Sequence, residues 1–422
     1  MVGCGVVGQG VLHHLARNHD LLAERSGSGF EVCRVAVRDT ARARGVDASR
    51  ITDDWRKVVS DPAVDIVVEL MGGTTTAREV AVAALEAGKP LVTANKALLA
   101  DAGEKLFTLA EQRGLGIYFE ASVAGGIPIL KALREGLRAN HIVSLHGIVN
   151  GTCNYILSRM AEEGKSYEEV LAEAKRLGYA EADESLDVDG IDAAHKACIL
   201  ASLAYGFWVK MSEVHVEGIR SVSALDIAFA RKLGYAIKLL AIIKPAEARA
   251  VQVRVHPTLI PLHNVLASVS GVYNAVAVEG DVVGHTLFYG RGAGPDATAS
   301  AVLSDVAEAA LDLSGGVCQR RVVTHGFYGH ALPVEQVISR YYVRLTVLNR
   351  PGVLAQVSTI LGKYGIGISS VFQPEGHDGE TVPLVMLLDS ATGGQFDQAY
   401  REICALPVVH EPCQRIRVED LS

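Results

Sequence analysis

The sequence predicts an α/β protein with a doubly wound parallel sheet, an α+β second domain and a C-terminal βαββαβ domain. Short β-rich runs alternate with helical stretches over residues 1–125, the pattern becomes mixed over residues 126–318, and a strand-first unit spans residues 340–422. Such alternation is typical of βαβ units around a parallel sheet. The length of 422 residues suits two or three domains, at roughly 150 residues each.

The first domain contains four predicted strands with helices between them. The strands are expected at residues 31–37, 64–70, 90–93 and 116–119, and alanine-rich helical stretches at 78–87 and 104–113. In an open α/β sheet, ligands bind outside the carboxyl ends of the strands. Residues that follow these strands are therefore candidates for a binding site.

A glycine-rich turn opens the chain and predicts a Rossmann-like dinucleotide site. Gly3, Gly5 and Gly8, with Val6 and Val7 between them, form a GxGxxG pattern that a helical segment follows. The glycines permit a tight turn and close backbone approach to a pyrophosphate, which the first amides of the helix can bind. Only Met1 and Val2 precede the pattern. Either the usual central strand lies upstream of Met1, which we favour, or the sheet lacks it.

The end of the second predicted strand bears on the choice of cofactor. An acidic residue at this place binds the ribose 2′-hydroxyl of NAD, whereas an arginine accommodates the 2′-phosphate of NADP. Here Arg38 precedes Asp39, and Arg42 and Arg44 follow. The arginines favour NADP over NAD, although a solvated helix face accounts for them equally well.

The second domain, residues 126–318, is expected to have an α+β layout. A helix is predicted at residues 128–136, a strand at 144–149 and mostly helix up to 203, with strands at 251–260 and 265–278. Gly292 and Gly294 precede a helix at 298–313. A linker is predicted over residues 319–339, where the periodicity lapses.

The third domain begins with alternating apolar residues on one face of a strand. A turn at residues 349–352 leads into a helix, because Val353, Val357 and Leu361 recur at helical spacing. Strands at 369–373, 382–389 and 408–418 and a helix at 395–406 complete a βαββαβ order.

Composition excludes several classes of protein. The net charge is −8, from 40 Lys+Arg and 48 Asp+Glu, which argues against a partner in nucleic acid or anionic membrane. No apolar run reaches the roughly 18 residues of a membrane span, and the start does not look like a secretory signal. Seven scattered cysteines without a CxxC pair predict neither disulfides nor a zinc site. We expect a cytoplasmic protein that acts on small molecules.

Four motifs, in their order along the chain, give it a resemblance to a known family. They lie at residues 93–97, 119–128, 150–157 and 178–196. With them the chain resembles homoserine dehydrogenases over nearly its whole length, and its third domain resembles the ACT regulatory domain of the monofunctional bacterial form. It departs from the family at its short N-terminus and at Glu184, where the family often has proline. The resemblance implies NAD(P)-dependent interconversion of L-homoserine and L-aspartate 4-semialdehyde for threonine, methionine and isoleucine synthesis, in a homodimer or homotetramer.

Asp192 and Lys196 are the candidate catalytic pair. They are four residues apart on a predicted helix and so share one face. A lysine in so apolar a helix has a lowered pKa when desolvated, which suits a general acid, whereas an ordinary surface ion pair is the alternative. The resemblance implies that Lys196 exchanges the proton of the substrate oxygen. It also implies that Glu181 binds the substrate ammonium and that Asp187 and Asp192 hold the hydroxyl end, although acids near a helix start are also common caps.

The resemblance implies that residues 126–318 bind substrate and dimerise and that residues 290–313 return to the cofactor cleft. It also implies further contacts to cofactor and to a cation. Lys96 is expected between nicotinamide and substrate as a third catalytic residue, with Thr93, Gly178, Gly292 and Gly294 at the cofactor. The backbone carbonyls of Glu120, Val123, Gly125 and Ile127 would bind a structural sodium ion, and a turn without an ion is the alternative.

The third domain is expected to bind a pathway amino acid, with threonine as the expected effector. The ligand site would lie at the turn formed by Asn349, Gly352, Val353 and Leu354, where the glycine allows close approach to a carboxylate. A domain that only dimerises is one alternative. Another is a catalytically impaired scaffold that works as an amino-acid sensor.

Overall fold

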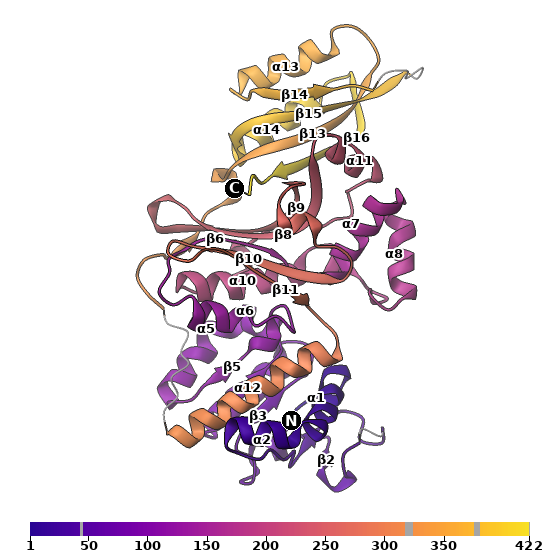
Figure 1. Ribbon diagram of the computed structural model, residues 1–422. Coiled ribbons are helices and arrows are strands. Elements are labelled where there is room, and N and C mark those ends of the chain that lie inside the picture. Colours follow the sequence, from indigo (N-terminus) through magenta and orange to yellow (C-terminus); the bar gives the residue numbers. More distant parts are fainter. Residues whose placement is uncertain (43–44, 317–323, 375–379, 422) are drawn as a thin grey trace. The chain divides into compact units, whose positions relative to one another are not determined.

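The computed structural model describes residues 1–42, 45–316, 324–374 and 380–421, and they form two compact units (Figure 1). Unit 1 comprises Met1–Leu145, Ala194–Ser212 and Asn274–His330, and unit 2 comprises His146–Ala193, Glu213–Tyr273 and Ala331–Ser422. The mixed α/β class predicted from the sequence is confirmed. Of the described helices, none is long and apolar enough to cross a membrane.

Unit 1 contains the Rossmann-like parallel sheet. The strands β3 (Val67–Glu69), β4 (Leu91–Thr93) and β5 (Ile117–Tyr118) pair in parallel, as do β1 (Val35–Ala36) and β2 (Ile51–Thr52). Each expected strand is present but short. The expected strand at residues 31–37 shrinks to two residues, because only Val35 and Ala36 have a parallel partner in β2.

Residues 1–3 take the central position of this sheet. Val2 forms parallel bridges with both Ala36 and Glu69. Its N–H donates to Val68 O at 2.8 Å, and its carbonyl accepts the N–H of Leu70 at 2.8 Å. The sheet therefore does not lack its centre, although only a bridge stands where a full strand is usual. The amino group of Met1 donates to Arg34 O at 2.8 Å, and burial lowers its pKa to about 5.

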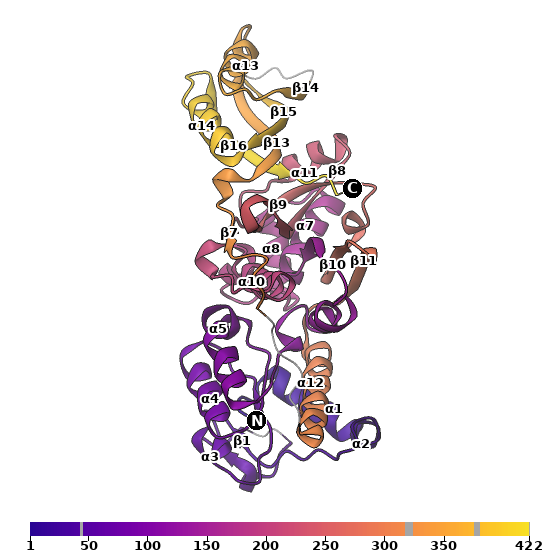
Figure 2. The same ribbon diagram turned by 90° about the vertical axis from the view of Figure 1, so that its left-hand side faces the viewer.

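Helices cover this sheet, and two of them come from distant parts of the chain. α1 (Val6–Arg17) lies beside α12 (Pro295–Gly315) in both views (Figure 1 and Figure 2). A Cβ on Gly10 of α1 would lie 2.8 Å from Pro295 O, so the close approach requires a glycine. The other helices entirely within unit 1 are α2 (His19–Ser26), α3 (Arg56–Val59), α4 (Thr75–Glu86), α5 (Lys96–Arg113) and α6 (Ile129–Lys131), which a π-turn continues to Gly136.

The strands after residue 140 correct one sequence prediction. The first residues of β6 (Ile142–Ile148) belong to unit 1 and the last ones to unit 2. β10 (Tyr273–Gly280) and β11 (Gly284–Arg291) are neighbouring strands. The strand expected at residues 265–278 is wrong over its first half. Val265–Ser268 is a 3₁₀ turn, because the side chain of Asn264 caps it by accepting the N–H of Leu266 at 2.9 Å.

Unit 2 is built on a long antiparallel hairpin. β8 (Tyr235–Pro245) pairs with β9 (Ala250–Pro261) along its whole length, and β7 (His215–Val216) runs parallel to β9. The helices are α7 (Gly151–Glu163), α8 (Tyr167–Arg176), α9 (Ser185–Val188) and α11 (Ala224–Lys232), while α10 (Ile191–Tyr205) begins in unit 2 and continues into unit 1.

The C-terminal part of unit 2 has the predicted βαββαβ order. We call it the βαββαβ module: β13 (Ile338–Leu348), α13 (Val353–Lys363), β14 (Ile368–Phe372), β15 (Thr381–Thr392), α14 (Gly393–Cys404) and β16 (Val409–Val418). Its antiparallel strands lie in the order β16-β13-β15-β14. Tyr341 stacks on Phe396 in its core, with ring centroids 3.6 Å apart. In the stretch predicted as a linker, β12 (His330–Ala331) and a 3₁₀ turn at Val334–Gln336 form, and residues 319–323 lie outside the described residues.

A buried ion pair joins the module to α11. The guanidinium of Arg344 on β13 donates to both carboxylate oxygens of Asp226, at 2.6 and 3.0 Å, and Tyr342 Oη adds a bond at 3.1 Å. The side chain of Asp226 is fully buried and that of Arg344 is 6% exposed. Removal of one partner of such a pair leaves a charge without compensation.

We expect Arg344→Met to lower the free energy of unfolding by about 3–5 kcal/mol. The reason is that the carboxylate of Asp226 would stay buried without its cation. Chemical denaturation measures the loss, and the double variant Arg344→Met, Asp226→Asn is the control, because an amide carries no charge. A double variant as unstable as the single one would contradict this account.

Candidate active site

The expected site residues are divided between the two units, so each set is described within its own unit. Unit 1 holds the glycine pattern, Thr93, Lys96, Lys196 and the expected cation ligands. Unit 2 holds Gly178, Glu181, Asp187 and Asp192.

The glycine pattern forms a turn that ends at the start of α1. Gly3 has φ +93°, and a Cβ there would lie 2.6 Å from Leu70 O, while a Cβ on Gly8 would lie 2.9 Å from Gly3 O. Gly5 instead faces open space, since no atom lies within 4 Å of its Cβ position. The first amides of α1, at Val6, Val7 and Gly8, have no acceptor inside the helix. A tight turn, an open approach and aligned amides fit the pyrophosphate of a dinucleotide.

Arg38 and Asp39 are both exposed just beyond β1. The carboxylate of Asp39 accepts the N–H of Ala41 at 3.0 Å, so it shapes the local turn. Arg44 lies outside the described residues. The arrangement is compatible with either dinucleotide.

A buried hydrogen-bond network around the side chain of Glu69 fixes the C-terminal ends of β3 and β4. Thr93 Oγ1 donates to Glu69 Oε2 at 2.6 Å and accepts the N–H of Asn95 at 3.0 Å. Burial raises the pKa of Glu69 despite these hydrogen bonds. The side chain of Asn95 caps α5 by accepting the N–H of Leu98 at 3.1 Å, which places Lys96 at the first position of the helix. Sequence reasoning missed Glu69 and Asn95, although an asparagine at the start of a predicted helix is a recognisable cap.

In unit 1, the turn expected to bind a cation contacts the glycine-rich segment expected at the cofactor. Ala124 and Gly125 both have positive φ, 53° and 44°, and a Cβ on Gly125 would lie 2.6 Å from Gly292 O. Gly126 N–H donates to Arg291 O at 3.1 Å. A Cβ on Gly292 would lie 1.8 Å from Asn274 Nδ2, so a glycine is required there. Gly294, with φ 111°, then starts α12.

The carbonyls expected to bind sodium lie in this sharp turn, and two of them accept backbone hydrogen bonds. The carbonyl of Ile127 accepts the N–H of Ile129 at 2.8 Å, and that of Glu120 accepts the N–H of Val123 at 3.4 Å. The carboxylate of Glu120 points instead to the amides of Leu130 and Lys131, at 2.9 Å each, and burial raises its pKa to about 7. Within the described residues, no group of three or more His, Cys, Asp or Glu could hold a metal ion.

In unit 2, one amide holds two of the predicted carboxylates. Asn150 Nδ2 donates to Asp187 Oδ1 at 2.7 Å and to Asp192 Oδ2 at 2.9 Å. Its Oδ1 accepts the N–H of Cys153 at 2.8 Å, so the same side chain caps α7. Thr152 Oγ1 adds a bond to Asp187 at 3.2 Å. The structure therefore brings Asp187 and Asp192 together, through a residue whose role sequence reasoning missed.

Asp192 and Lys196 stand one turn apart on α10 and are 8% and 7% exposed. A surface ion pair, the alternative left open above, is wrong because both side chains are buried. Glu181 is exposed in the loop between α8 and α9, beyond Gly178, whose φ is +76°. The side chain of Glu181 is thus exposed, whereas those of Asp192 and Lys196 are buried.

The glycine turn at a helix start on a parallel sheet is typical of NAD(P)-binding domains, and the comparisons identify an NAD(P)-dependent oxidoreductase. Family models agree: residues 3–120 match "Homoserine dehydrogenase, NAD binding domain" and residues 128–307 match "Homoserine dehydrogenase". The chain belongs to the homoserine dehydrogenase family and acts on homoserine.

Close relatives support this over the full length. The homoserine dehydrogenase of Pseudomonas aeruginosa is 44% identical over 427 residues, which cover 100% of this chain and 98% of the relative. The crystal structure of the enzyme from Thiobacillus denitrificans matches with a TM-score of 0.94 and 43% identity, covering 100% of this chain and 97% of that one. A hyperthermophilic archaeal homoserine dehydrogenase in complex with NADPH matches with a TM-score of 0.62 and 30% identity, covering 74% of this chain and 96% of that one.

The glycines at positions 3 and 5 give a matched pair of variants. Gly5→Ala should fold normally but bind NADPH at least about tenfold more weakly, because the new methyl group occupies the approach of the pyrophosphate. Gly3→Ala should lower the melting temperature as well, since its Cβ would collide with Leu70 O. Calorimetric titration and thermal unfolding separate the two effects. Unchanged NADPH affinity in folded Gly5→Ala would contradict the assignment of this turn.

Proposed function

We propose that this chain interconverts L-homoserine and L-aspartate 4-semialdehyde with Lys196 as general acid and base. The observation that carries the assignment is a buried lysine one turn after Asp192, whose carboxylate is held beside that of Asp187. The nicotinamide supplies or accepts the hydride at the substrate carbon. Lys196 gives a proton to the carbonyl oxygen during reduction and takes it back during oxidation.

The carboxylates have separate roles in this proposal. Asp192 and Asp187 bind the hydroxyl end of the substrate and stabilise the ammonium of Lys196, and Asn150 sets the separation of the two carboxylates. Glu181 binds the substrate ammonium from its exposed position in the loop before α9. Lys96, at the first position of α5, orients the nicotinamide and substrate.

NADP is the proposed cofactor, with NAD as the alternative. Support comes from exposed Arg38 beyond β1 and from the NADPH complex of the archaeal relative. The positive φ angles of Ala124 and Gly125 support a structural sodium ion on the carbonyls of Glu120, Val123, Gly125 and Ile127. Thr93, Gly178, Gly292 and Gly294 are proposed to line the dinucleotide.

The βαββαβ module is proposed to be an ACT domain that binds threonine and lowers activity. Gly352 starts α13 with φ +88°, and no atom lies within 4 Å of its Cβ position. Asn349 N–H donates to Glu380 O at 2.8 Å, which fixes the turn, while Val353 is buried and Leu354 is 43% exposed. The exposed edge strand β14 supports pairing of two modules in a homodimer or homotetramer.

We expect Lys196→Ala to lower kcat by about 10²- to 10⁴-fold, the usual contribution of general acid catalysis. Affinity for NADPH should stay nearly unchanged, because the side chain acts on the substrate oxygen. Steady-state kinetics and NADPH titration check both statements, with exposed Lys232→Ala as the control. A variant that keeps more than about a tenth of the activity would remove Lys196 from this role.

We expect threonine to inhibit the full-length enzyme and Asn349→Ala to abolish the inhibition without changing basal activity. The amide of Asn349 can bond the effector in the proposed turn. Inhibition curves measure the change, and exposed Gln398→Ala on α14 is the control. Deletion of the module is no clean test, because β16 pairs with β9 and Glu419 bonds Arg254 at 2.8 Å. Equal inhibition of the wild type and Asn349→Ala would contradict the turn as the ligand site.

A further inference from the structure

The acidic loop between α8 and α10 is held in place by an arginine from another segment. Arg220 Nε donates to Asp189 Oδ1 at 2.6 Å, and its Nη1 donates to Glu184 Oε1 at 3.1 Å. Its Nη2 reaches Ser185 Oγ at 3.3 Å. One guanidinium thus contacts residues on both sides of Asp187.

Glu184 completes this arrangement. Lys175 Nζ lies 2.6 Å from Glu184 Oε2 and donates to Ala182 O at 3.0 Å. These contacts, led by the bond from Lys175, lower the pKa of Glu184 to about 2. Glu184 therefore stays ionised at physiological pH, and its ion pairs with Lys175 and Arg220 restrain the loop.

The backbone next to Arg220 also contacts the loop. Ile219 N–H donates to Val188 O at 2.8 Å. A Cβ on Gly218 would lie 2.3 Å from the same carbonyl oxygen, so any other residue would push the two segments apart. Val188 directly follows Asp187, whose carboxylate shares the amide of Asn150 with Asp192. A shift of residues 218–220 would therefore move one of the proposed substrate ligands.

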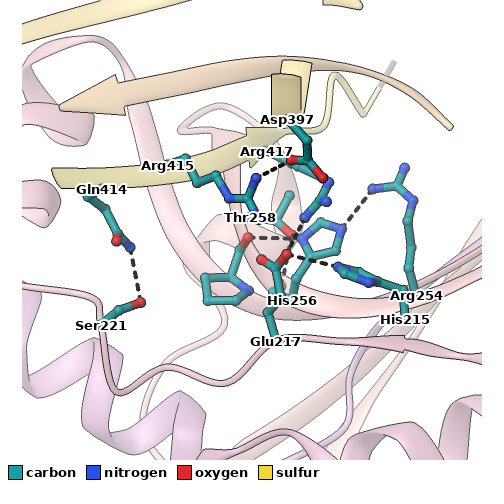
Figure 3. Close-up of polar contacts among 11 residues, drawn as sticks. His215, Glu217, Ser221, Arg254, His256, Thr258, Asp397, Gln414, Arg415 and Arg417 are labelled. Carbon is teal, nitrogen blue, oxygen red and sulfur yellow. Dashed lines mark hydrogen bonds and ion pairs between the residues drawn. The ribbon is translucent and has the colours of Figure 1, made fainter. Parts of the chain in front are cut away.

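The segment of residues 217–221, which contains Arg220, is bonded at both ends to β16 of the βαββαβ module, as Figure 3 shows. Gln414 Nε2 donates to Ser221 Oγ at 3.2 Å, and Arg417 Nη1 donates to Glu217 Oε1 at 2.8 Å. Burial opposes ionisation of Glu217, but its bond with His215 and the charge of Arg417 outweigh this and hold its pKa well below the usual range.

A cavity leaves room between these bonds. It measures about 420 Å³ and is lined by Gly218, Arg220 and Ser221 on one side and by Tyr400, Gln414 and Arg415 on the other. The middle of the segment is therefore not packed against the module. The segment itself is anchored in unit 2, since Ile219 is fully buried and Glu217 N–H donates to Val255 O at 2.8 Å, and the polar contacts at Glu217 and Ser221 tie it to the module.

We propose that residues 217–221 couple the βαββαβ module to the substrate-binding loop, with Arg220 as the positioning residue for that loop. Arg220 holds residues 184–189 in the conformation that binds homoserine, and the bonds to Gln414 and Arg417 make this conformation depend on the module. The inference rests on the proposed substrate roles of Glu181 and Asp187.

The first test is a kinetic comparison. Arg220→Gln should raise KM for homoserine about tenfold, as expected for the loss of hydrogen bonds between charged groups, with kcat within about threefold and KM for NADPH unchanged. Arg220→Lys, which can keep one ion pair, should lie between the wild type and Arg220→Gln. Exposed Arg231→Gln on α11 is the control and should match the wild type. An unchanged homoserine KM in folded Arg220→Gln would overturn the positioning role.

The second test reads the loop without turnover. Amide hydrogen exchange in residues 181–189 should be faster in Arg220→Gln and also in Gln414→Leu, although Gln414 bonds Ser221 and not the loop. Normal exchange in Gln414→Leu would overturn the coupling to the module. Glu181→Gln and Asp187→Asn test the proposed substrate roles separately from the coupling. If both variants keep the wild-type homoserine KM, the substrate roles fail. The exchange experiment still decides whether the module and the loop are coupled.

Discussion

The shared amide of Asn150 is the interaction on which the proposed chemistry depends. Two carboxylates close together repel one another. An amide that donates one N–H to each keeps both in place without adding a charge, while its oxygen is fixed by the start of α7. The helix start, the carboxylate pair and the beginning of α10 are therefore one structural unit, and Lys196 follows one turn later.

Much of this could be predicted from the sequence because the signals are local. The GxGxxG turn, the βαββαβ order and the i,i+4 spacing of Asp192 and Lys196 depend on short-range geometry, and the structure shows each of them. The expected strands were too long in the first domain, since strand ends depend on which neighbour is available for pairing. The strand predicted at Val265–Ser268 is wrong because its apolar residues suit a strand, whereas the side chain of Asn264 closes a turn.

The rest could not be predicted because it joins residues far apart in the sequence. The contact between Gly292 and Asn274, and that between Gly125 and Gly292, appear only when the chain is folded. Arg220 gives no signal of its own in the sequence, because one arginine among many acquires a role only when Asp189 and Glu184 face it. Glu184 was visible as a departure from the family, but its partners Lys175 and Arg220 were not.

The module is also bound to the rest of unit 2 by charge, which bears on how a regulatory signal can travel. Glu419, after β16, contacts Arg254 and Lys244 of the β8–β9 hairpin, and Asp226 holds Arg344 of β13. Buried ion pairs depend strongly on geometry, so small displacements of a strand change their energies more than those of apolar contacts. The polar contacts of residues 217–221 connect β16 with the segment that bonds the loop at residues 184–189, which is the route required by the proposed coupling.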